Sequence, residues 1–113
     1  MRIDIEIYET AGKKRPFEAW IKGIKEVHTK AKIYTRLDRL QVGNFGDCKT
    51  IEGGVCELRI HYGPGIRVYY GRIGNKVILL LCGGAKDSQA RDIAKAKEYF
   101  NDYQARKIEN GKK

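Results

Sequence analysis

The chain has 113 residues, of which 42% are hydrophobic, and a formal net charge of +9 at pH 7. This apolar content excludes a wholly disordered chain, the length fits a single domain over residues 1–113, and no apolar run approaches the roughly 20 residues that cross a bilayer. The cationic excess favours a polyanionic partner, which means nucleic acid, an anionic membrane surface or an acidic protein. The amino terminus alternates charged and aliphatic residues, unlike a signal peptide, so we expect a cytoplasmic protein with no membrane partner.

The cysteines indicate a reducing compartment. Cys48, Cys56 and Cys82 are odd in number and show no C-x-x-C spacing, so reduced thiols are expected. Together with two histidines they supply no obvious zinc site. We therefore expect neither a metal nor another cofactor.

The first part of the chain predicts one strand and two helices. Residues 2–8 alternate isoleucine with charged side chains, which is typical of a strand. Pro16 suits the first turn of a helix, and apolar residues recur at helical spacing after it. A second helix is predicted over residues 26–41 by the same periodicity. The two helices should form an αα-hairpin.

Further along the chain the apolar period changes to two. Residues 48–51 could add a short strand, and stronger strands are predicted over 55–62, 66–72 and 76–82. The last of these is almost continuously aliphatic, as in a strand at the centre of a sheet with both faces covered.

A loop over residues 83–86 should lead into a final helix capped by Asp87 or Ser88. Residues 110–113 are expected to be a frayed tail. The predicted order is β-α-α-β-β-β-α, an α+β domain in which helices pack on an antiparallel sheet. The core residues of the final helix should be Ile93, Ala96, Phe100 and Tyr103.

A group of polar residues in the central hairpin could carry chemistry. Alternation puts Glu57, Arg59 and His61 on one side of their strand, Arg67 on the outward side of the next strand, and Lys86 at the end of the adjacent one. Cleavage of RNA by its own 2′-hydroxyl requires a base, an acid and cations around the phosphate. Glu57 or His61 could accept the proton, His61 or a lysine could donate one, and the arginines could hold phosphate oxygens.

Other residues could contact RNA more weakly. Tyr69, or Tyr62 if exposed, could stack on a base, and Lys13, Lys14 and Arg15 could contact phosphates. Alternation alone favours a plainer interpretation, in which the polar strand face is solvated surface with cross-strand ion pairs and the lysine-rich segment is an ordinary turn.

Two stretches resemble a known family. Residues 54–70, with the motifs ELR and GIRVYY, are similar to the central hairpin of RelE/ParE-superfamily toxins, and most of all to the HigB-like branch of addiction-module killer proteins. Residues 77–89, with the motif LLLCGGAK, resemble that branch's signature after the last long strand, and the similarity continues through 92–97. The resemblance implies a RelE-like fold and a type II toxin held inactive by a cognate antitoxin, here a small helix-turn-helix protein.

The resemblance also implies ribosome-dependent, metal-independent cleavage of mRNA by attack of the 2′-oxygen. Carried over by position, the cationic roles of RelE-type enzymes fall on Arg59, Arg67 and Lys86. Glu57 occupies a site where the RelE pattern has lysine, which leaves Glu57 and His61 as the candidate proton acceptors.

Two further hypotheses stay open at this stage. The ParE-like branch shares the fold but inhibits gyrase and has no nuclease activity, and a plain RNA-binding module would have no activity at all. Three outcomes of expressing the chain would distinguish them. Cleavage of transcripts within codons indicates the nuclease, DNA breaks indicate the gyrase inhibitor, and harmless overexpression indicates the RNA-binding module.

Overall fold

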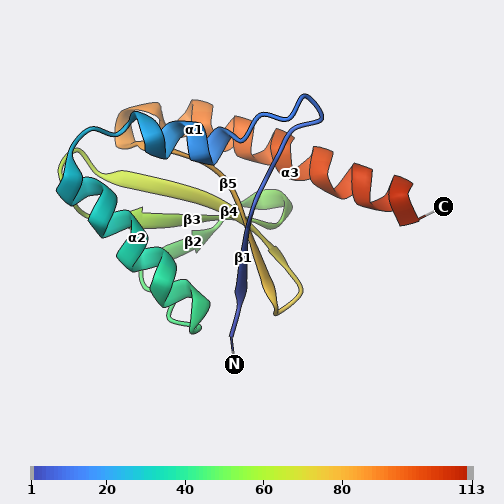
Figure 1. The fold of residues 1–113 in the computed structure, drawn as a ribbon, viewed down its shortest axis with the longest axis horizontal. Coiled ribbons are helices and arrows are strands. Elements are labelled where there is room, and N and C mark those ends of the chain that lie inside the picture. Colours follow the sequence, from blue (N-terminus) through green and yellow to red (C-terminus); the bar gives the residue numbers. More distant parts are fainter. Residues whose placement is uncertain (1, 112–113) are drawn as a thin grey trace.

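The computed structural model describes residues 2–111, which form one five-stranded sheet with three α-helices (Figure 1). Neighbouring strands follow the order β1-β5-β4-β3-β2 across the sheet. The elements are β1 (Asp4–Ile7), α1 (Pro16–Gly23), α2 (Val27–Gln41), β2 (Cys48–Thr50), β3 (Val55–Ile60), β4 (Ile66–Ile73), β5 (Val77–Ala85) and α3 (Gln89–Gly111), with 3-10 turns at Glu52–Gly54 and Lys86–Ser88.

The α+β class is confirmed, but the expectation of a purely antiparallel sheet is wrong. β1 pairs with β5 in parallel, whereas the β5–β4, β4–β3 and β3–β2 pairs are antiparallel. The helical hairpin carries the chain from β1 at one edge of the sheet to β2 at the other. This crossover leaves β1 free to cover the outer edge of β5, and β2 adds a fifth strand that the predicted order omits.

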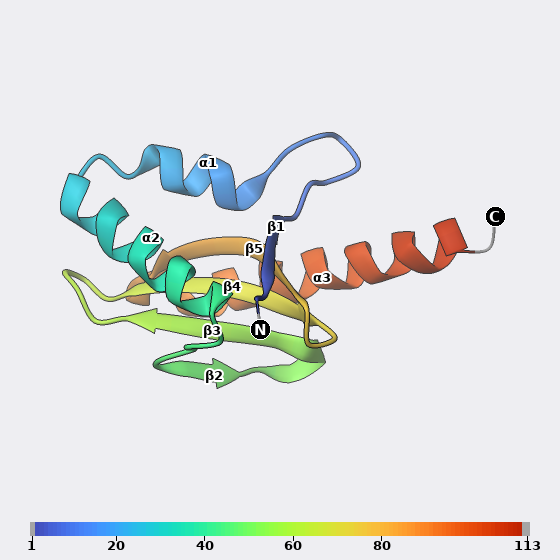
Figure 2. The same ribbon diagram turned by 60° about the horizontal axis from the view of Figure 1, so that its bottom comes forward.

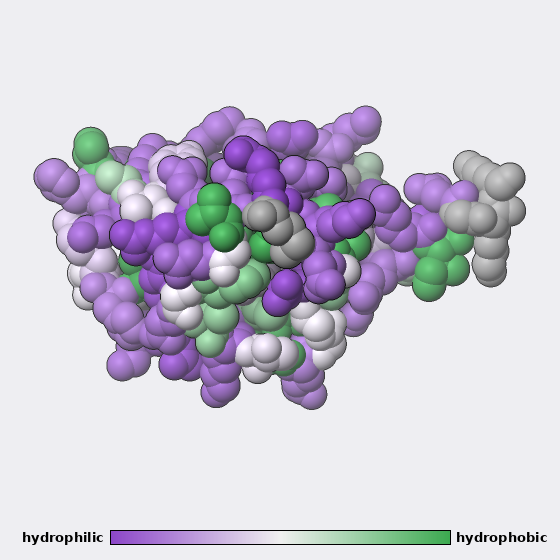
Figure 3. All heavy atoms as spheres, turned by 90° about the horizontal axis from the view of Figure 1, so that it is seen from below, coloured by the Kyte–Doolittle hydropathy of each residue, from purple (hydrophilic) through white to green (hydrophobic). Residues whose placement is uncertain are grey.

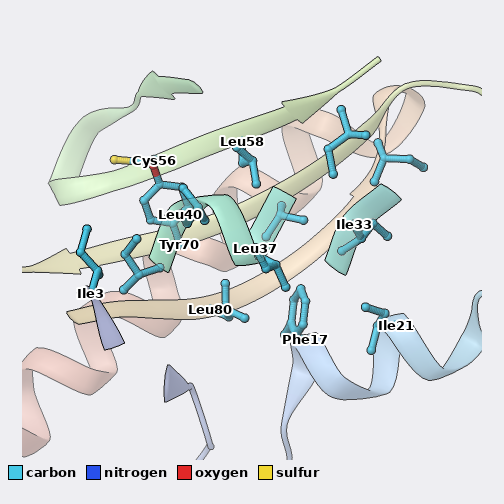
Figure 4. Packing of buried hydrophobic residues seen from close by; sticks show 14 residues of the cluster. Ile3, Phe17, Ile21, Ile33, Leu37, Leu40, Cys56, Leu58, Tyr70 and Leu80 are labelled. Carbon is cyan, nitrogen blue, oxygen red and sulfur yellow. The ribbon is translucent and has the colours of Figure 1, made fainter. Parts of the chain in front are cut away.

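The sheet lies between two helical layers, as Figures 1 and 2 show together. Helices α1 and α2 cover one face and bury a cluster of fourteen hydrophobic residues, among them Leu58, Tyr70 and Leu80 (Figure 4). Helix α3 covers the other face, where Tyr69 and Phe100 are buried. Each buried leucine or phenylalanine contributes about 1.5–3 kcal/mol, so apolar burial holds both layers in place.

The helix starts follow local chemistry. α1 begins at Pro16, as predicted. α2 begins at Val27, and the Glu26 carboxylate caps it by accepting the backbone N–H groups of His28 at 2.9 Å and Thr29 at 2.8 Å. α3 continues through Gly111, two residues into the tail predicted to be frayed, while residues 112 and 113 lie outside the described part of the chain.

β5 extends to Ala85, so most of the predicted 83–86 loop is strand. The register between β4 and β5 shifts between Tyr69 and Tyr70, as in a β-bulge. After this shift Gly83 faces α1 and Gly84 faces α3. A Cβ at Gly83 would lie 2.4 Å from the Trp20 ring, and one at Gly84 only 1.9 Å from an Asp92 carboxylate oxygen. Both glycines are therefore required by close packing.

The side of the molecule drawn in Figure 3 is mainly polar, and apolar atoms there are confined to small areas. No helix in residues 2–111 combines the length and the apolar character that crossing a bilayer demands.

Candidate functional site

Two arginines stand directly opposite each other on the central hairpin. Arg59 of β3 and Arg67 of β4 are Cα partners in the antiparallel register, so their side chains leave the same face of the sheet. That face is the one covered by α3. Like charges directly opposite repel each other, so this pair requires a counter-charge.

The counter-charge is Glu57, whose side chain is only 1% exposed. Its Oε1 accepts a hydrogen bond from Arg59 Nε at 2.9 Å. Its Oε2 accepts from Gln89 Nε2 at 2.7 Å and from the Tyr69 hydroxyl at 3.2 Å, and lies 3.9 Å from Arg67 Nε. One buried carboxylate thus ties β3 and β4 to the first turn of α3.

These contacts keep Glu57 ionised. Burial tends to raise the pKa of its carboxyl, but the hydrogen bonds from Arg59 and Gln89 and the positive charge of Arg67 outweigh burial and hold the pKa below its ordinary value. Burial and the neighbouring Glu57 charge raise the pKa of Tyr69, which stays a neutral donor. An ionised carboxylate surrounded by donors is a poor proton acceptor but a strong positioning group.

Arg67 retains unused hydrogen-bonding capacity. The residue is 8% exposed, and its Nε is buried with no hydrogen-bond partner among residues 2–111. Buried polar groups are nearly always paired, and this nitrogen is an exception, held by its 3.9 Å ion pair with Glu57. Anions with several oxygens, such as phosphate, match the planar guanidinium group best.

Lys86 supplies a third cation at the same end of the sheet. Its backbone N–H donates to the carbonyl of Gly65 at 2.9 Å, and Gly65 comes two residues before Arg67 in the chain. Lys86 is therefore beside the β3–β4 turn. Its side chain is exposed. The structure therefore brings Arg59, Arg67 and Glu57 into contact and adds Lys86 at their border.

The remaining predicted residues lie elsewhere. His61 is exposed and pairs with Asp47, and that hydrogen bond holds the pKa of the Asp47 carboxyl below its ordinary value. The expectation that Tyr69 stacks on a base is wrong for this structure, since its ring is fully buried under α3. Tyr62 is partly exposed and can take that role.

The segment Lys13, Lys14 and Arg15 precedes α1, at the end of that helix away from the β3–β4 turn (Figure 1). Arg15 is engaged by Glu9 at 3.2 Å and Glu18 at 3.1 Å. The segment is separate from the Glu57 cluster, and its arginine is already neutralised.

Sequence reasoning missed Gln89 and the pair formed by Ser88 and Asp92. The Ser88 hydroxyl donates to the Asp92 carboxylate at 2.5 Å, above Gly84. The sequence contains one indication of this arrangement: the final helix has an apolar stripe, which must pack on a face of the sheet. If the helix is assigned to the face that carries Glu57, the polar residues of its first turn are expected next to that carboxylate.

These features define an α+β domain with a buried carboxylate between two sheet arginines. The sequence matches no family model. An uncharacterized protein of Haemophilus influenzae is 47% identical over 81 residues, which cover 72% of this chain and 82% of that protein. The chain belongs to the family of that protein.

Proposed function

We propose that this protein is a toxin of the RelE/ParE superfamily, of the HigB-like branch, that cleaves mRNA at the ribosome in the cytoplasm. The observation that carries the proposal is the cross-strand pairing of Arg59 with Arg67 around the buried Glu57 carboxylate, with Arg67 Nε making no hydrogen bond within residues 2–111. The α+β fold with its helical hairpin and final helix is compatible with a RelE-like arrangement. The ELR motif lies in β3 and contains Arg59, and the GIRVYY motif leads into β4 and contains Arg67.

The proposed reaction uses the RNA's own nucleophile. A base removes the proton of the 2′-hydroxyl, the 2′-oxygen attacks phosphorus, and the bond from phosphorus to the 5′-oxygen breaks as that oxygen takes up a proton. The products are a 2′,3′-cyclic phosphate and a 5′-hydroxyl. Negative charge grows on the non-bridging oxygens in the transition state, and Arg59 and Arg67 stabilise it.

The roles of the other residues follow from their environments. Glu57 positions the arginines and does not accept the proton, because its pKa is lowered and its oxygens are occupied. Proton transfer falls first to Lys86, which is exposed beside the arginine pair. His61, the other candidate, is exposed but pairs with Asp47 and lines the opposite side of β3. No cofactor takes part in this scheme.

A toxin of this class requires a cognate antitoxin. We infer a small helix-turn-helix partner whose acidic or apolar segments cover the cationic surface of a chain with net charge +9. The ribosome and its mRNA are the other partners.

The test compares Arg67→Ala with Arg72→Ala. Arg72 is an exposed arginine on the same strand, so the control removes the same charge outside the site. With purified ribosomes and a translated mRNA, we expect Arg67→Ala to reduce cleavage by about 10²–10³-fold, as loss of a donor to a developing oxyanion does, and Arg72→Ala to cleave normally.

Equal cleavage by the wild type and Arg67→Ala would overturn the site. DNA breaks with intact transcripts after induction would favour the gyrase inhibitor. If overexpression without an antitoxin is harmless, the remaining hypothesis is an RNA-binding module without activity.

A further inference from the structure

A second cationic surface lies on the opposite side of β3 from the Glu57 cluster. A groove of about 460 Å³ runs between one side of α2 and the end of β3. No carboxylate is among the nine residues that line it. They are His28, Ala31, Lys32, Thr35, Arg36, Arg39, Ile60, His61 and Tyr62.

The lining residues of α2 recur every three or four positions, so they form a single stripe on the helix. Lys32 and Arg39 are exposed at this stripe, more than one turn apart. Two carboxylates beside the groove are already engaged, since Glu26 caps α2 and Asp47 pairs with His61, and Asp38 of α2 is not among the lining residues. The groove therefore presents positive charge that the protein itself does not neutralise.

An aromatic ring stands beside these cations. Tyr62 is partly exposed, and the Lys32 ammonium lies 5.5 Å from the centre of its ring. The Tyr62 hydroxyl donates a long, exposed hydrogen bond of 3.4 Å to Glu26. A partly exposed ring beside cations is a combination that binds single-stranded nucleic acid, because a base stacks on the ring while phosphates contact the cations.

The groove is joined to the arginine pair through the backbone. Arg36 donates to the carbonyl of Arg59 at 2.7 Å and to that of Phe45 at 3.3 Å, so α2 is attached to β3 at the residue whose side chain binds Glu57. The β3–β4 turn, the start of α2 and the start of α3 gather at one end of the molecule (Figures 1 and 2). A strand of RNA can pass around this turn from one surface to the other.

We propose that this groove binds the single-stranded RNA that flanks the scissile phosphate, with Tyr62 stacking on a base and Lys32 and Arg39 contacting phosphates. The inference rests on the proposed function for the position of the cleaved bond. Binding by itself does not depend on cleavage. An acidic protein segment would also be attracted to the cations, but it would make no use of the aromatic ring. Single-stranded RNA uses the cations and the ring together.

The probe is a fluorescent 12-nucleotide RNA with 2′-O-methyl groups throughout, which cannot be cleaved by 2′-attack. Anisotropy titrations compare the wild type with Lys32→Ala/Arg39→Ala, with Tyr62→Leu, and with the control Lys76→Ala/Lys107→Ala. The control also removes two charges, from the β4–β5 turn and the far half of α3. Each variant is first checked for native circular dichroism.

We expect the groove double variant to bind about tenfold more weakly than the control and to lower the slope of log affinity against log salt by about 1.4, or 0.7 per lost phosphate contact. Tyr62→Leu should weaken binding about tenfold with an unchanged salt slope, because stacking is not ionic. Binding by both groove variants equal to that of the control would overturn the inference. So would binding of a polyglutamate peptide as tight as that of the RNA and unaffected by Tyr62→Leu.

The outcomes separate this inference from the proposed function. If ribosome assays show no cleavage but the groove variants lose RNA binding, the proposed function fails and the groove assignment holds. If the wild type cleaves mRNA and the groove variants bind and cleave like the control, the groove assignment alone fails.

Discussion

The two faces of the sheet differ in what they bury. The face under α1 and α2 packs against these helices in a cluster of fourteen buried hydrophobic residues. The face under α3 combines an apolar cluster with the buried charged residues Glu57, Arg67 and Asp92. Because β3 and β4 send alternate side chains to each face, the same strands serve both. The difference teaches that apolar burial on one face stabilises the fold, and that this stability offsets the cost of burying charged side chains on the other face.

The largest expected effect on stability comes from the apolar face. Leu58 is fully buried and lies between Glu57 and Arg59 in β3, on the opposite face. Leu58→Ala should lower the free energy of unfolding by about 3 kcal/mol, through lost transfer energy and a cavity. Urea unfolding measures this loss, with the exposed Val42→Ala as control.

The comparison of faces also predicts that Leu58→Ala keeps its activity. At a temperature where the variant is fully folded, RNA cleavage should match that of the wild type. A large loss of cleavage by the folded variant would show that the two faces are not separable in this way.

Glu57→Gln tests the charged face with a change of similar shape. We expect a loss of about 2 kcal/mol near pH 7, because hydrogen bonds from Arg59 and Gln89 lose their charged acceptor. The control is Glu52→Gln, which removes an exposed carboxylate paired with Lys97. Chemical unfolding of both variants gives the comparison, and the control should change stability much less.

The pH dependence of this loss has a definite sign. The pKa of Glu57 is lower in the folded protein than in the unfolded chain, so its stabilisation is complete above the unfolded value of about 4.3 and is lost as pH falls through the folded value. The stability difference between the wild type and Glu57→Gln should therefore shrink on acidification below about pH 4. A difference independent of pH would show that the Glu57 charge is not stabilising.

A smaller effect is expected at the other end of the α3 face. The Tyr8 hydroxyl donates a partly buried hydrogen bond of 2.6 Å to Asp102, and burial of the side chain together with this hydrogen bond raises the pKa of Tyr8 to about 12. Tyr8→Phe should cost about 1 kcal/mol at pH 7, the value of one hydrogen bond. The exposed Tyr34→Phe is the control, and thermal or urea unfolding is the measurement.

The contribution of Tyr8 to stability changes with pH in the opposite direction to that of Glu57. The raised pKa of Tyr8 stabilises the fold fully below the unfolded value of about 10, and this contribution disappears as pH rises toward 12. The wild type should therefore lose stability between pH 10 and 12 more steeply than Tyr8→Phe. Identical alkaline profiles would contradict the hydrogen bond between Tyr8 and Asp102.

Much of the local structure was predictable from short-range patterns. Alternation put Glu57 and Arg59 on one face of β3, and the structure agrees, because the two side chains are hydrogen-bonded while Leu58 between them packs in the cluster of the opposite face. The start of α1 at Pro16 was also correct. Such features depend on the twofold period of a strand or the chemistry of a single turn, so neighbouring residues are enough to determine them.

The less predictable features depend on distant contacts. The polar face of the hairpin was expected to be open, yet Gln89 and the rest of α3 cover it, and Tyr69 is buried as a result. The register shift beside Tyr69 and the close packing over Gly84 depend on side chains from other elements. Periodicity within one strand contains no information about which helix packs on it.

The sequence by itself determined the positive charge of this chain, the period of each main strand and helix, and the two arginines on one face of the central hairpin. Only the tertiary structure decided that β1 runs parallel to β5, that α3 covers the polar face, and that Glu57 is buried between Arg59 and Arg67. The physical reason is range: charge and period belong to short stretches of chain, whereas burial and ion pairing arise when segments distant in sequence pack together.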